Sequence, residues 1–162
     1  MVSSTALRKV VVGAGTAAVV AISIITSGTM HVGRLPAHVL RACGSMALFA
    51  SASLALAIHR SYPKRHDLPS DFSELLTEGP YRVCRHPFYL LLIVAQFSIS
   101  LSMLSLLGLL TAAALIPLWV LLIRLEEKEL ITYWGERYLE YMERVPMLIP
   151  VLWKAGKRSK SS

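Results

Sequence analysis

The sequence predicts an all-α integral membrane protein with about four transmembrane helices and a cytosolic C-terminal helical segment. Of its 162 residues, 54% are hydrophobic and 17% are charged, whereas soluble domains average about 45–50% and about 25%. The apolar residues are gathered into long charge-free runs, and the basic residues lie almost entirely between particular runs. The length fits a single domain over residues 1–162, and so apolar a composition excludes an intrinsically disordered chain.

The charge-free runs define the membrane helices. Residues 10–30 and 42–58 form runs of 21 and 17 residues, and each suits one helix, because about 20 helical residues cross a bilayer core. Residues 87–123 form a run of 37, about twice the required length. We therefore expect a hairpin of a third and a fourth helix, with its turn near Ser105–Gly108, where small residues allow a sharp reversal.

The distribution of Lys and Arg predicts the orientation. With the N-terminus in the cytoplasm, the inner segments hold 15 of the 17 basic residues and the outer loops hold only Arg34 and Arg41. Because cytoplasmic loops are enriched in Lys and Arg, both termini and segment 59–86 are expected on the cytoplasmic side. This bias accounts for the net charge of +7, so the expected partner of the basic residues is the bilayer and not nucleic acid. The sequence leaves the oligomeric state open. The expected parts are two N-terminal transmembrane helices (1–58), a catalytic region (59–150) and a basic tail (151–162).

The first polar stretch on the cytoplasmic side comes directly before the third helix. Pro87 suits the first turn of that helix, where a missing N–H costs nothing. Arg85 and His86 precede the helix N-terminus, which favours a bound anion. Two interpretations stay open from the residues alone: a site for a carboxylate or phosphate, or an orienting charge followed by an N-cap residue.

The second polar stretch follows the fourth helix. Glu126 and Glu127 come about one turn after its apolar end and point about 100° apart, so one of them can face the protein while the other faces water. Gly135 is expected to end this helix, and the next helix carries Tyr138 and Tyr141 on one face. The alternative is a solvated helix of mixed charge beside the membrane.

Two other patterns predict no chemistry. Cys43 and Cys84 are too few for a zinc site or a disulfide framework, and no metal is expected. The glycines of Gly13-Ala14-Gly15 resemble a dinucleotide fingerprint, but no acidic residue follows about 20 positions later. These glycines instead favour close helix packing.

Together the two polar stretches resemble the isoprenylcysteine carboxyl methyltransferase family and the related phospholipid methyltransferases. The resemblance covers residues 73–150 and rests on linked motifs that flank a helical hairpin. The motifs read Gly79-Pro80-Tyr81 to Arg85-His86-Pro87-Phe88-Tyr89, Glu126-Glu127, Trp134-Gly135-Glu136-Arg137-Tyr138-Leu139-Glu140-Tyr141, and Arg144-Val145-Pro146 to Pro150.

The resemblance implies an S-adenosylmethionine-dependent methyltransferase that acts at the cytosolic membrane face on a lipid or prenylated acceptor. The first expectation is carboxyl O-methylation of an isoprenylcysteine-like substrate. The alternatives are a phospholipid or amine N-methyltransferase, a sterol-reductase relative, and a non-catalytic membrane protein that keeps the fold. The residues expected to bind the cofactor are Leu75, Leu76, Tyr81, Arg85, His86, Pro87, Tyr89 and Glu126, with Arg85 and His86 on its methionine carboxylate.

Two departures from the family bear on the acceptor. Leu91 stands where relatives often have Gly, which alters local helix packing. Leu122 stands where eukaryotic members have a substrate-binding Arg, and Arg124 is expected to replace it beside an acceptor carboxylate. Glu127 is the expected base if the acceptor is instead an amine.

Overall fold

The computed structural model describes residues 4–30, 36–61 and 74–149. Within these ranges the regular elements are all helical, which confirms the predicted fold class. The predicted basic tail, 151–162, lies outside the described residues, as does part of segment 59–86. The elements are α1 (Ser4–Ile25), α2 (Ala37–Ser61), the 3-10 helix η2 (Gly79–Arg82), α3 (Pro87–Ser102), α4 (Leu106–Trp134) and α5 (Glu136–Arg144).

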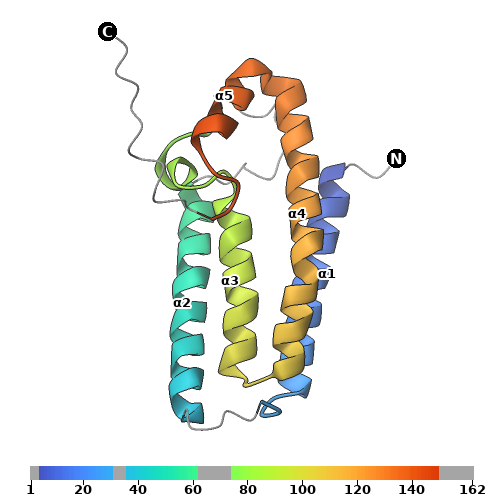
Figure 1. The fold of residues 1–162 in the computed structure, drawn as a ribbon, viewed down its shortest axis with the longest axis vertical. Helices are drawn as coiled ribbons and strands as arrows, with labels where there is room; N and C mark the ends of the chain where they lie inside the picture. The colour runs from blue at the N-terminus through green and yellow to red at the C-terminus, as the bar shows by residue number, and fades with distance from the viewer. Residues whose placement is uncertain (1–3, 31–35, 62–73, 150–162) are drawn as a thin grey trace.

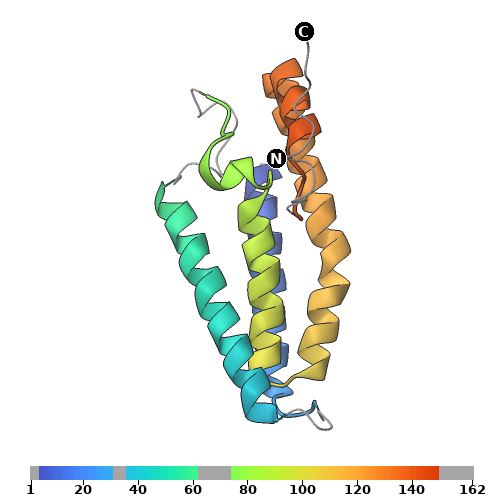
Figure 2. The ribbon, with the colours of Figure 1, turned by 60° about the vertical axis from the view of Figure 1, so that its left-hand side comes forward.

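Helices α1, α2, α3 and α4 stand side by side, and the other described elements gather at one end (Figure 1). The central helix is α3, which contacts α2 on one side and α1 and α4 on the other. Figure 2 shows that α2 leans away from α3 toward the end that carries η2, whereas α4 extends past the bundle and leads into α5. The elements outside the bundle therefore meet where α3 begins.

Three helices, α1, α2 and α4, are long and apolar enough to cross a membrane, which supports a membrane protein. The short apolar helix is α3, with 16 residues, or about 24 Å at 1.5 Å per residue. The sequence pattern placed the short span in the second helix, but α2 has 25 residues because it begins before Arg41 and continues through Arg60.

The α3–α4 hairpin turns slightly earlier than predicted. Helix α3 ends at Ser102, and Leu104 takes a positive φ of 50°. Ser105 then caps α4, because its side-chain oxygen accepts a hydrogen bond from the N–H of Gly108. Thus Ser105 begins the new helix, and Gly108 lies inside it.

Small residues set how closely the helices approach. A methyl group on Gly44 of α2 would lie 2.5 Å from the backbone nitrogen of Ser102 in α3. A methyl group on Gly108 of α4 would overlap the hydroxyl oxygens of Ser23 in α1 and of Ser100 in α3. Small residues at helix contacts are typical of membrane proteins, and here they let α3 approach α2 closely and α4 approach both α1 and α3.

Polar side chains inside the bundle are paired with one another. Gln96 of α3 is 2% exposed; it donates to the Thr16 hydroxyl and accepts from the indole N–H of Trp119 in α4. The Ser23 and Ser100 hydroxyls lie 3.0 Å apart. Interhelical hydrogen bonds of this kind stabilise membrane bundles modestly, and here they join α1, α3 and α4 into one support for the residues at the end of α3.

Candidate active site

The segment before α3 is shaped by its glycine and prolines. The 3-10 helix η2 begins at Gly79, which has a φ of 58°, and continues through Pro80 to bury Tyr81. Four residues later the chain reaches Arg85 and then His86, which occupies the N-cap position of α3 ahead of Pro87. Both side chains are therefore held at the N-terminal end of the central helix.

Helices α4 and α5 lie opposite the start of α3 and close over it. Helix α4 ends at Trp134, as the sequence predicts, because Gly135 adopts a φ of 57° and its N–H bonds the carbonyl of Ile131. The chain then turns into α5, whose Tyr138 and Tyr141 are buried. These two tyrosines face back toward the start of α3.

The residues after α5 are joined to the start of α3 by backbone hydrogen bonds. The N–H of Arg85 donates to the carbonyl of Pro146 at 2.9 Å, and that of His86 donates to the carbonyl of Met147 at 3.1 Å. The Tyr141 hydroxyl donates to the carbonyl of Tyr81 at 2.6 Å. Together, α5 and the residues after it thus cover the N-terminal end of α3, through hydrogen bonds to the two residues before α3 and to η2.

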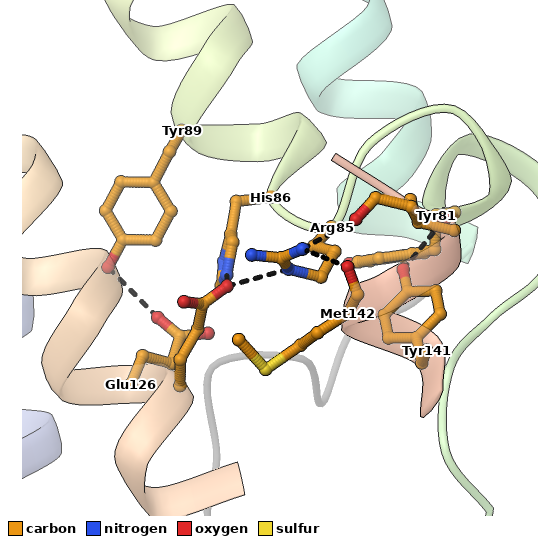
Figure 3. A network of polar contacts seen from close by, with 9 residues as sticks. Tyr81, Arg85, His86, Tyr89, Glu126, Tyr141 and Met142 are labelled. Carbon is orange, nitrogen blue, oxygen red and sulfur yellow. Dashed lines mark hydrogen bonds and ion pairs between the residues drawn. The ribbon is translucent and has the colours of Figure 1, made fainter. Parts of the chain in front are cut away.

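A buried ion pair lies beneath this cover. Arg85 Nε donates to Oε1 of Glu127 at 2.8 Å, and the side chains of Arg85 and Glu127 are 7% and 6% exposed. The same oxygen lies 3.2 Å from Nε2 of His86 (Figure 3). Arg85 Nη1 also donates to the carbonyls of Met142 and Val145. Arg85 therefore joins α4, α5 and the start of α3.

The neighbouring carboxylate, Glu126, points differently. Its Oε2 accepts a hydrogen bond of 3.1 Å from the Tyr89 hydroxyl, and the side chain is half-buried (Figure 3). The predicted division between the two glutamates therefore holds in part: Glu127 is buried in the protein, and Glu126 keeps access to a cavity. The Tyr89 ring packs edge-on against His86, with ring centres 5.9 Å apart.

All eight residues predicted to bind a cofactor line one pocket at this end of the bundle. Two segments thus converge: the stretch of about fifteen residues before and into α3, and the C-terminal part of α4. The sequence interpretation did not assign the other lining residues, although its aromatic pattern on α5 was a usable signal for two of them. The added lining residues are Glu74, Phe88, Leu130, Trp134, Tyr138 and Tyr141.

The two residues predicted to be catalytic lie elsewhere. Arg124 is exposed and does not line the pocket, and Leu122 is buried in the core cluster with Tyr89 and Trp119. Glu127 is held by Arg85 and His86 and does not line the pocket either. Neither residue therefore belongs to the lining that the eight expected cofactor residues share.

Burial keeps the tyrosines of α5 in their protonated form. Burial raises the pKa of Tyr138 and of Tyr141 above the ordinary value, although the Arg85 guanidinium opposes the shift in both. Burial also raises the pKa of the Cys84 thiol, against a lowering contribution from the His86 backbone N–H. These groups are therefore neutral at physiological pH. Within the described residues no cluster of side chains suits a metal ion.

The family comparison agrees with the motifs. A model of the phospholipid methyltransferase family matches residues 39–137, which is more than half of the chain. The chain belongs to the phospholipid methyltransferase family. No curated protein and no solved structure matches the chain significantly.

Membership of this family supports a membrane methyltransferase and a lipid-type substrate. The region of the chain that matches the family runs from the beginning of α2 to the first residues of α5. It includes most of the pocket, and it leaves out α1 and the segment after α5 that covers the pocket.

Proposed function

We propose that this protein transfers a methyl group from S-adenosylmethionine to the amine of a lipid acceptor at the cytosolic face of the membrane. The observation that carries the proposal is the convergence of the eight residues expected to bind the cofactor on one pocket at the end of a bundle of membrane helices. The cytosolic placement rests on the distribution of Lys and Arg, because 15 of the 17 lie in segments expected on that side of the membrane.

The lining residues suit the proposed cofactor. Apolar and aromatic walls from Leu75, Leu76 and Trp134 suit an adenine ring. Glu126 offers a carboxylate to a sulfonium or to ribose hydroxyls. Arg85 Nη2 has no hydrogen bond to the described residues, so it is the nitrogen of that guanidinium that remains to meet a carboxylate. When bound, the cofactor supplies an electrophilic methyl group.

The charges at the pocket favour an amine acceptor over a carboxylate. A carboxylate acceptor requires a partner cation, but Arg124 lies outside the pocket lining, and Arg85 is bonded to Glu127 and assigned to the carboxylate of the cofactor. Two carboxylates, Glu74 and Glu126, do line it. Negative lining attracts an ammonium group and repels a carboxylate, so the geometry supports the alternative of a phospholipid or amine N-methyltransferase better than O-methylation.

An ammonium acceptor must lose a proton before its nitrogen can attack, and His86 is placed to receive it. Glu127 is paired with Arg85 and accepts hydrogen bonds, so His86 Nε2 donates in their contact. This tautomer leaves a lone pair on Nδ1, which has no hydrogen bond to the described residues, and His86 lines the pocket. Glu127 thus acts through His86 by fixing its tautomer.

The test uses purified protein in nanodiscs with methyl-labelled S-adenosylmethionine and two acceptors, phosphatidylethanolamine and a farnesylated cysteine. We expect label in the phospholipid and none in the cysteine, and the reverse result would overturn the amine assignment. His86→Gln should lower the rate by about 100-fold or more, as for loss of a general base. The matched control is Glu140→Gln, which changes an exposed ion pair of α5 and should leave the rate unchanged.

A further inference from the structure

The first helix carries none of the motifs, yet it supplies a charge at the edge of the site. Arg8 of α1 donates from Nη2 to Oε2 of Glu129 in α4 at 2.7 Å, across 121 residues of sequence. The two side chains are 12% and 32% exposed. Residue 8 lies outside the region that matches the family, residues 39–137, and in the sequence alone it is one of the basic residues that set the orientation in the membrane.

Glu129 lies three residues after Glu126 on α4, and residues with this spacing are neighbours on a helix surface. Two carboxylates at this spacing repel one another, which favours conformations that move them apart. A guanidinium bonded to Glu129 offsets this repulsion. The contact with Arg8 therefore bears on how Glu126 is held.

The same charges reach the partner of Glu126. The charges of Arg8, Glu126 and Glu129 all act on the Tyr89 hydroxyl, which donates to Glu126 at 3.1 Å. These four groups thus form one electrostatic cluster with one side on the pocket, because Tyr89 and Glu126 line it and Arg8 and Glu129 do not.

We propose that Arg8 is a positioning residue for cofactor binding, which acts by pairing with Glu129 and so keeps Glu126 hydrogen-bonded to Tyr89 and turned to the pocket. The inference rests on the proposed function, because it assigns Glu126 to the cofactor. It adds a contribution from the first helix that the family motifs do not contain. A purely structural role, in which Arg8 only fastens α1 to α4, makes a different prediction.

The test measures binding of S-adenosylhomocysteine by isothermal titration and thermal unfolding on the same detergent-purified full-length variants. Arg8→Met and Glu129→Gln should each weaken binding by about tenfold, within the range of coupled neighbouring charges, and the double variant should be no weaker than either single one. Arg8→Lys should bind within about threefold of the parent, because lysine keeps the positive charge that faces Glu129.

The matched control is Val19→Ala, which truncates a fully buried apolar side chain of α1. It should lower the unfolding temperature at least as much as Arg8→Met does while leaving the affinity within about twofold, since Val19 lies outside the cluster that holds Tyr89 and about three helical turns from Arg8. If Arg8→Met and Val19→Ala weaken binding equally, or Arg8→Met leaves it unchanged, the positioning role is overturned and the proposed function stands. If the parent protein itself binds no S-adenosylhomocysteine, both are overturned.

Discussion

The buried pair between Arg85 and Glu127 allows the sharpest prediction about stability. We expect Glu127→Gln to lower the free energy of unfolding by about 3 kcal/mol, the low end of the range for removing one partner of a buried ion pair. The low end applies because the amide keeps the volume and an acceptor oxygen, whereas the guanidinium charge loses its counter-ion at 7% exposure. A loss of this size changes the folded-to-unfolded ratio by more than about 100-fold.

The measurement is equilibrium unfolding in mixed micelles of a mild detergent and dodecyl sulfate. The control is Glu140→Gln, which breaks an ion pair with Arg144 whose side chains are 60% and 72% exposed. Exposed pairs of this kind contribute about 0–1 kcal/mol, so this variant should unfold almost as the parent does. Equal losses in the two variants would refute the reasoning, since burial would then have no bearing on the contribution of the pair.

Two further predictions concern packing and pH. Gly44→Ala should destabilise the bundle by about 1–3 kcal/mol in the same unfolding assay, because the methyl would meet the Ser102 backbone at 2.5 Å; Gly13→Ala, with open space around it, should be neutral or stabilising, and a neutral result at both positions would contradict the packing. Tyr141 has its pKa raised by burial, so the folded state keeps this proton longer than the unfolded state does, and stability should be constant below about pH 10 and fall above it. Tyr141→Phe should lose about 1 kcal/mol at neutral pH through its bond to Tyr81 and fall less steeply in alkali, and a pH profile identical to the parent's would count against this assignment.

The sequence predicts the bundle well because its signals are local. Charge-free runs indicate the helices, the double-length run indicates the α3–α4 hairpin, and Gly135 marks the end of α4. The predicted turn is displaced because Ser105 acts as a cap rather than as part of the turn. Serine is common both in turns and at helix N-caps, so the sequence alone does not show which of the two positions Ser105 occupies.

The site is predictable only as far as its motifs reach. The motif residues before α3 and Glu126 come together as predicted, because the two stretches begin at the same end of a hairpin. Glu126 faces the pocket because Arg85 and His86 hold Glu127 away from it. The 100° between neighbouring residues on a helix predicts that the two glutamates point differently, but not which one faces the pocket. Arg8 pairs across 121 residues, and no local pattern in the sequence carries such a contact.

The cover over the start of α3 has a consequence for the order in which the protein matures. Arg85 and His86 emerge from the ribosome well before their partners Pro146 and Met147. Because the covering segment is the last of these elements to be synthesised, Arg85 and Glu127 can pair only after α4 has been made, and their cover can form only after residue 147. Docking of the segment after α5 is therefore a late step, and it is the step that takes the two charges out of water.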